Sequence, residues 1–258
     1  MQVNAMINLF KMDLYRFTRN KIMYLLLLLF CAFQIFGIFM MKQYEQPVEG
    51  RPMLSSLTES EFIQYTISQP PSWMLIYIAV FTIYFYMSEW NSGFSKNYIS
   101  MRQARSHSVF SKMAILSLFV AMMFLTLLVA DGIARKLLWD QTDLGEPGAF
   151  ITLLAGQFLL HWAFSLLILC IAMVTRNLLV SLTASIVLAL NVIGMVLEAL
   201  ENLFTDIHLT KYLLINTIIR VKDLGSTADL IHTFGVAIAA ILFLSYFAVR
   251  YKIREDLN

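Results

Sequence analysis

Six long apolar runs constrain this sequence more than any other feature. They occupy residues 22–41, 73–88, 113–130, 149–174, 178–197 and 232–249. A bilayer core of roughly 30 Å requires about 20 apolar residues in helical form. A backbone inside lipid must also satisfy its own hydrogen bonds, which a helix does. The runs therefore predict an all-α, polytopic membrane protein with six transmembrane helices.

The composition agrees with burial in lipid rather than in a soluble core. Of the 258 residues, 59% are apolar and 14% are charged, whereas about 25% of residues are charged in an average soluble domain. A soluble fold of this length has too little interior to hide so much apolar surface. The first run is too long for the apolar core of a secretion signal, so we expect it to stay as an anchor. Residues 1–258 are expected to form a single transmembrane domain.

Lysine and arginine are divided unequally between the two sides of the predicted helices. Twelve of the 19 lie in the N-terminal segment, the loop after the second run, the turn after the fourth run and the C-terminal tail. The remaining seven lie in the other connecting segments. Basic residues in short segments near helix ends mark the cytoplasmic side. The pattern therefore predicts that both termini face the cytoplasm.

Two connecting segments have an amphipathic pattern without the length to span a bilayer. Residues 5–20 alternate apolar and basic residues at helical spacing, with Lys11, Arg16 and Arg19 followed by Lys21. This pattern favours a helix in the inner interface, although simple anchoring by positive charge is an alternative. Residues 198–231 favour one or two short helices lying at, or dipping into, the outer interface.

Polar and aromatic side chains inside the runs are candidates for lining a transport pathway, because polar groups are costly in lipid. Gln157 and His161 are four residues apart and share one helix face, and the second run is rich in aromatic residues. Packing between helices is the alternative for both groups. A proton relay would need several ionisable groups at depth, and only His161 is well inside a run. The candidate lining residues are Phe81, Tyr84, Phe85, Gln157, His161 and Asn191.

The two cysteines, Cys31 and Cys170, lie in apolar runs without a CxxC spacing. We interpret them as small apolar side chains and not as a disulfide or a metal site. The sequence also contains no GxxxxGK[ST] phosphate loop, no HExxH and no GxSxG. We therefore expect no catalytic site and no metal site in this chain.

The loop after the second run carries the most specific pattern. An acidic residue, a glycine, a Lys-Asn pair, a serine and basic residues follow one another there: Glu89, Gly93, Lys96, Asn97, Ser100, Arg102 and Arg105. This order resembles the membrane subunit of ATP-binding-cassette exporters of the type two class. The N-terminal basic segment resembles the elbow helix of that family, and the segment before the sixth run resembles its short re-entrant helices.

The resemblance implies a division of labour between subunits. The chain would be a permease that works with a second permease copy, identical or related, and with two copies of an ATPase subunit. ATP and magnesium would bind to the ATPase and not to this chain. A short cytosolic helix around Lys96–His107 would dock in a cleft of the ATPase, with Glu89 contacting a basic group on it.

The same resemblance leads us to expect export of an amphipathic cargo from a bacterial cell, across its cytoplasmic membrane. A peptide, toxin or bacteriocin is the first expectation, and a drug is another. Membrane lipid is the remaining expected partner, and no nucleic-acid partner is expected. Two other classes stay open. A secondary transporter would need inverted repeats or buried charges, and the sequence indicates neither. An intramembrane enzyme would need a paired catalytic constellation at depth, which His161 alone does not supply, and a membrane scaffold is the last alternative.

Overall fold

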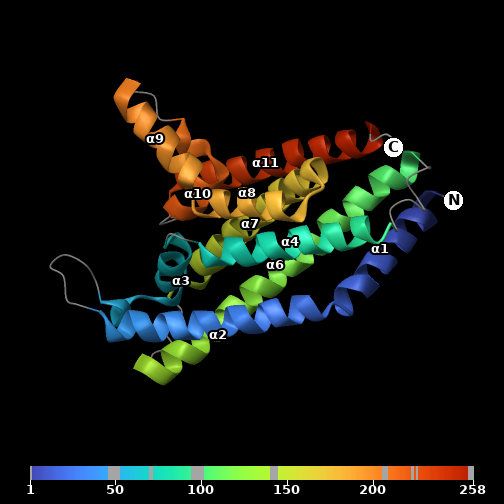
Figure 1. Cartoon of the computed structure of the whole chain (residues 1–258). Helices are drawn as coiled ribbons and strands as arrows, with labels where there is room; N and C mark the ends of the chain where they lie inside the picture. The colour runs from blue at the N-terminus through green and yellow to red at the C-terminus, as the bar shows by residue number, and fades with distance from the viewer. Residues whose placement is uncertain are drawn as a thin grey trace.

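The computed structural model describes residues 2–45, 53–69, 72–93, 102–139, 145–204, 209–221, 224 and 226–254. Within these residues the protein is helical and contains no strand. The long helices run side by side in an elongated bundle, and both termini lie at the same end of it (Figure 1). We call this the termini end, and we call the other the opposite end.

Within the described ranges, five helices are long and apolar enough to cross a membrane. They are α2 (Lys21–Gln43), α4 (Trp73–Asn91), α6 (Arg102–Trp139), α7 (Pro147–Thr175) and α11 (Thr227–Arg254). The fifth predicted span is instead a pair of helices, α8 (Leu178–Ala189) and α9 (Val192–Phe204), bent by 48° at their junction. The described residues therefore contain five candidate spans, or six if the bent pair counts as one. The prediction of a multi-pass helical membrane protein is confirmed.

The amphipathic N-terminal segment forms its own helix, α1 (Gln2–Thr18), before the first span. The break between α1 and α2 is stabilised by Asn20, whose side-chain oxygen accepts hydrogen bonds from the backbone N–H groups of Ile22 (3.0 Å) and Met23 (3.3 Å). Such an N-cap satisfies backbone donors that the first turn of a helix leaves free. The change of direction is therefore encoded locally. That α1 lies in the interface remains a prediction.

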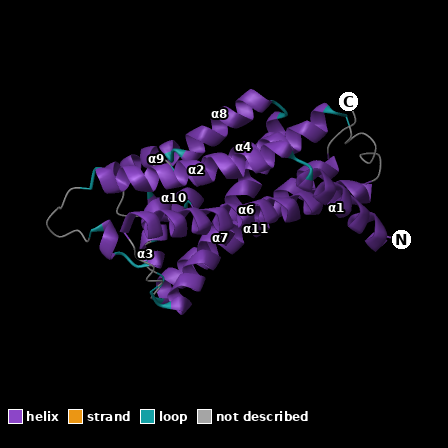
Figure 2. Cartoon of the chain, turned by 90° about the horizontal axis from the view of Figure 1, so that it is seen from below, coloured by secondary structure: helices purple, strands orange, loops and turns teal. Residues whose placement is uncertain are grey.

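Short helices gather at the opposite end of the bundle (Figures 1 and 2). Between α2 and α4 these are η1 (Leu54–Ser56) and α3 (Glu59–Ser68). Between α9 and α11 they are η2 (Thr210–Tyr212) and α10 (Leu214–Arg220). Short helices were predicted in the second of these segments. Their re-entry into the membrane remains a prediction.

Most buried apolar side chains of the described residues form one cluster, built mainly from α4, α6 and α7. Helix α11 packs on α7 and α6, helix α2 packs on α6, and α4 packs on α7 and α8. Helices α2 and α11 keep broad apolar faces on the outside, where Leu28 is 67% exposed and Leu242 is 66% exposed. A soluble protein rarely exposes apolar faces of this extent, so these faces fit contact with lipid or another membrane subunit.

Candidate functional site

Four charged side chains meet at the termini end of the bundle, and we call them the charge cluster: Asp13, Arg16, Glu89 and Lys112. Arg16 pairs with Asp13 at 3.0 Å and also with Glu89. Lys112 donates to Glu89 at 3.0 Å and lies 3.7 Å from Asp13. The cluster joins three helices, because its members come from α1, α4 and α6.

Three members of the charge cluster are buried, Arg16 is half-buried, and the four formal charges cancel. Asp13 is 1% exposed, Glu89 is 2% exposed and Lys112 is 4% exposed. Ser111 adds a hydrogen bond to Asp13 at 2.6 Å. Buried charges are tolerated when they are paired and hydrogen-bonded, and the loss of one partner is strongly destabilising. The two carboxylates and the two cations therefore hold α1 against the ends of α4 and α6.

Arg16 extends the link from α1 to α4 beyond the ion pair. Its Nη2 donates to the backbone oxygen of Phe85 (3.3 Å) and to the hydroxyl of Ser88 (3.2 Å), and its guanidinium lies 4.9 Å from the Phe85 ring centroid. The other basic residues predicted for this segment behave differently. Lys11, Arg19 and Lys21 are exposed, so only Arg16 points into the bundle.

The structure changes the role expected of Glu89. We expected this carboxylate to contact a basic group on a partner, but it is buried between Arg16 and Lys112. Gly93 follows the end of α4 with φ +69, a conformation that suits glycine because it lacks Cβ. Glu89 therefore positions the start of the loop from inside the bundle.

The remainder of the predicted coupling loop is only partly described. Lys96, Asn97 and Ser100 lie outside the described residues. From Arg102 onward the chain belongs to α6, so residues 102–107 of the predicted separate cytosolic helix extend a membrane-spanning helix instead. Arg105 donates to the backbone oxygen of Ile253 at 3.1 Å. This bond joins the start of α6 to the last turn of α11.

Sequence reasoning missed three charged members of the termini end. Asp13 and Lys112 were read as part of an amphipathic pattern and a topology signal. Lys252 is 3% exposed, and its Nζ lies 5.4 Å from the ring centroid of Trp90, over which the guanidinium of Arg176 also lies at 4.5 Å. Of these three residues, only Asp13 could have been found from the sequence, because an acidic residue three positions before Arg16 can form an ion pair with Arg16 on a helix.

The aromatic candidates for pathway lining are mostly packed inside the bundle. Phe81 is fully buried, with its ring centroid 3.8 Å from that of Phe119 and 5.5 Å from that of Phe85. Phe85 is also buried. Tyr84 is half-buried and borders a recess of about 460 Å³ together with Arg16. In this conformation Phe81 and Phe85 form core contacts, which fits the packing alternative, and a role in lining a pathway stays a prediction.

The polar face of α7 is likewise closed. Gln157 is fully buried, and its Nε2 donates to the side-chain oxygen of Gln64 on α3 (3.0 Å) and to the backbone oxygen of Ile218 on α10 (3.1 Å). His161 is also fully buried, with Nδ1 2.7 Å from the backbone oxygen of Gln157. Gln157 thus joins α7 to two other helices, whereas this hydrogen bond of His161 stays within α7, and neither side chain faces an open pathway in this conformation. Gln157 anchors two short helices of the opposite end.

Asn191 lies where the fifth predicted span breaks. It adopts φ 54, a left-handed conformation that asparagine tolerates better than most residues. Its side chain donates to Asn216 of α10 at 2.6 Å, and Asn216 donates to the backbone oxygen of Thr210 at 2.9 Å. A Cβ at Gly194 would lie 2.1 Å from the Asn191 side-chain oxygen. The bend and the short helices therefore depend on each other.

A second buried group of charges joins α3 to α6 near the opposite end. Arg135 donates to Glu59 at 2.7 Å and to the backbone oxygen of Leu57 at 2.6 Å. Asp131, one turn earlier on α6, is 1% exposed and lies beside Glu59. Both ends of the bundle are thus fastened by buried charges.

One comparison with known proteins identifies a match to most of this structure. The sequence model of a family described as ABC-2 family transporter protein matches residues 9–194. That range contains the whole charge cluster, the polar face of α7 and the bend at Asn191, and it ends before α10 and α11. No curated protein matches the chain.

Proposed function

Because the chain belongs to the ABC-2 family of transporter proteins, we propose that it is a permease through which a separate ATPase drives the export of an amphipathic cargo. Membership of the family confirms the resemblance found in the loop after α4, and it makes this chain the membrane component of an ABC transporter. The ATPase, the outward direction and the cargo belong to the proposal.

The observation that supports coupling is the position of the charge cluster. Glu89 lies in the last turn of α4, at the start of the loop that joins α4 to α6, and it pairs with Lys112, which lies further along α6. Arg16 and Asp13 bring α1 to the same point. A force applied to the loop would therefore act on three helices together. Tightly packed interiors transmit such displacements instead of absorbing them.

In this proposal one group of residues contacts the ATPase, and a second group transmits its motion to the helices. We assign the contact to Lys96, Asn97, Ser100 and the basic residues that begin α6, Arg102 and Arg105. We assign transmission to Glu89 and the other members of the charge cluster. Two ATPase copies, carrying ATP and magnesium, would act on two permeases. The exposed apolar faces of α2 and α11 leave room for lipid and for the second permease.

The cargo we propose is a peptide, toxin or bacteriocin, with a drug as the next choice. The support is the apolar character of the spans, which suits a molecule that partitions partly into the membrane. Tyr84 and Asn191 are the lining candidates nearest to an open surface or a bend. A bacterial cytoplasmic membrane with both termini inside completes the proposal.

Copurification tests the proposal directly. Tagged chain is extracted from its native membrane in mild detergent, the eluate is analysed by mass spectrometry, and its ATPase activity is measured. We expect a soluble ATPase in a 1:1 ratio to the chain. Lys96→Glu should remove it, because a reversed charge at an interface costs association. Lys136→Glu is the matched control, since Lys136 is an exposed lysine at the opposite end of the bundle.

Three outcomes of this experiment distinguish the proposal from its alternatives. Loss of the ATPase in Lys96→Glu but not in Lys136→Glu supports coupling through the loop. A purified chain that hydrolyses ATP without a second protein contradicts the division between subunits. A chain that purifies alone from intact membranes favours the secondary-transporter or scaffold alternatives.

A further inference from the structure

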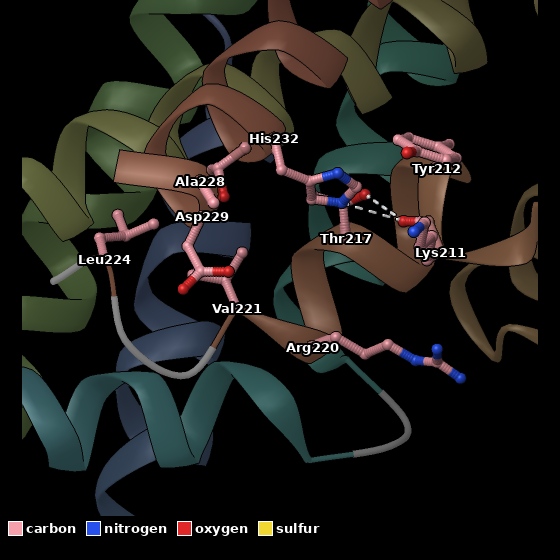
Figure 3. A pocket seen from close by; sticks show the side chains of 10 residues that line it. Lys211, Tyr212, Thr217, Arg220, Val221, Leu224, Ala228, Asp229 and His232 are labelled. Atoms are coloured by element: carbon pink, nitrogen blue, oxygen red, sulfur yellow. Dashed lines mark hydrogen bonds between the residues drawn. The ribbon is translucent and has the colours of Figure 1, made fainter. Parts of the chain in front are cut away.

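A polar pocket of about 550 Å³ opens at the opposite end of the bundle, between the η2–α10 segment and the first turns of α11 (Figure 3). Lys211 and Arg220 come from one wall, and Asp229 and His232 come from the other. His232 Nε2 lies 3.1 Å from the backbone oxygen of Lys211, so the two walls touch along one edge. The proposed function makes no use of this pocket.

The charges on the two walls are not all neutralised by the protein. Arg220 is paired with Glu198. Lys211 has its Nζ 5.0 Å from the Tyr212 ring centroid, and no carboxylate of the described chain forms an ion pair with it. Asp229 accepts a hydrogen bond from the Ser226 hydroxyl at 2.5 Å and has no basic partner among the described residues. One cation and one carboxylate are therefore available to a ligand.

An apolar groove continues from this pocket along α11. It has a volume of about 840 Å³ and shares Tyr212, Ala228 and His232 with the pocket. It extends to Phe243, and small residues such as Gly235 and Ala239 keep it hollow. Fifteen residues of helix between Ala228 and Phe243 span about 22 Å. That length exceeds the roughly 15 Å of apolar core in one leaflet.

We propose that the pocket and the groove together bind a zwitterionic phospholipid with a primary ammonium, of the phosphatidylethanolamine type. Its phosphate pairs with Lys211, its ammonium pairs with Asp229, and one acyl chain lies in the groove. An ammonium donates hydrogen bonds to a carboxylate, whereas a trimethylated choline headgroup has no N–H to donate. The site lies at the end of a spanning helix, where headgroups are found.

Lipid competition on the purified full-length chain tests this site. The chain in mild detergent receives equal amounts of phosphatidylethanolamine, phosphatidylcholine and phosphatidylglycerol with identical acyl chains, and retained lipid is counted by native mass spectrometry. We expect the ethanolamine lipid to be retained about tenfold more than the other two, the factor that corresponds to one charge-assisted hydrogen bond. Soluble phosphoethanolamine, which lacks acyl chains, should not displace it.

Variants separate the headgroup contacts from general effects on folding. Asp229→Asn should reduce retention of the ethanolamine lipid to that of the choline lipid, and Asp229→Glu should preserve the preference. Lys211→Gln should reduce all three lipids, because all carry the phosphate. Lys136→Gln, at another exposed lysine of this end, should change nothing. Ala239→Trp should fill the groove and expel lipid of every headgroup.

Three results would overturn the proposal. Equal retention of the three lipids by the unaltered chain removes the headgroup preference, as does an unchanged preference in Asp229→Asn. If Ala239→Trp leaves lipid retention unchanged but converts dimers to monomers, a second copy of this chain covers the groove instead. None of these outcomes depends on the ATPase or on transport.

Discussion

Replacing Lys112 by methionine tests whether the charge cluster acts as one neutral unit. The change keeps an apolar stem of similar length and removes the ammonium that lies 3.0 and 2.9 Å from the two oxygens of Glu89. Among the described residues, the ion pairs of Asp13 and Glu89 with Arg16 then remain, so the four-residue cluster keeps two carboxylates but only one cation. The perturbation is local, because Lys112 is 4% exposed and its partners are equally buried.

The expected cost follows from the burial. Removing one partner of a buried ion pair destabilises a protein by about 3–5 kcal/mol. We expect about 3 kcal/mol for Lys112→Met, because the Arg16 side chain is 25% exposed and water can reach part of the remaining charge. Glu89→Gln should cost a similar amount, since it leaves the four-residue cluster with two cations and one carboxylate. The double variant is neutral again, so it should cost only about 2 kcal/mol in lost hydrogen bonds.

Equilibrium unfolding of the full chain in mixed micelles, followed by circular dichroism, measures these differences. Lys11→Met is the matched control, because Lys11 is an exposed lysine of α1, and it should change stability by less than about 0.5 kcal/mol. The decisive comparison is between the double variant and each single variant. A double variant that costs the sum of both single costs, or a Lys112→Met variant as stable as the unaltered chain, would refute the reasoning.

Two further predictions use the same unfolding assay. Gly194→Ala places a methyl group 2.1 Å from the side-chain oxygen of Asn191 and should cost about 1–3 kcal/mol by overpacking. Gly37→Ala is its control, because nothing lies within 4 Å of the added methyl. This control should stabilise α2 by up to about 1 kcal/mol. Equal effects at the two glycines would count against the close approach of Gly194 to Asn191. Arg135→Met leaves the buried Glu59 carboxylate without its cation and should lower stability by about 3 kcal/mol. Combining it with Glu59→Gln should recover most of the lost stability. No recovery in the double variant would contradict the pairing.

Most helix positions could be predicted from the sequence, because the preference of a side chain for lipid or for water depends on its residue type and not on distant parts of the chain. The expected spans at 22–41 and 149–174 became α2 (Lys21–Gln43) and α7 (Pro147–Thr175). The third expected span, 113–130, became the much longer α6. Apolar periodicity marks only the part of a helix that prefers lipid, so the sequence did not show that the polar turns on either side continue the same helix.

The break in the fifth span was not predictable from its apolar run. Residues 178–197 have the length and hydropathy of a continuous helix, and Asn191 was expected to line a pathway. The bend depends on a hydrogen bond to Asn216, which is 25 residues further along the chain. The left-handed conformation of Asn191 costs free energy. The hydrogen bond to a partner that folding brings close offsets this cost. The partner lies outside the apolar run, so the run alone does not indicate the bend.

The sequence by itself determined that the chain spans a membrane, roughly where its helices lie, and to which transporter family it belongs. Each of these depends on residue type and order within short stretches. The tertiary structure alone decided which charges meet. Glu89 has a carboxylate that looked available to a partner subunit, yet Arg16 and Lys112, separated from it in sequence by 73 and 23 residues, neutralise it inside the bundle. Charge pairing is a property of distance in space, and the packing of three helices sets that distance.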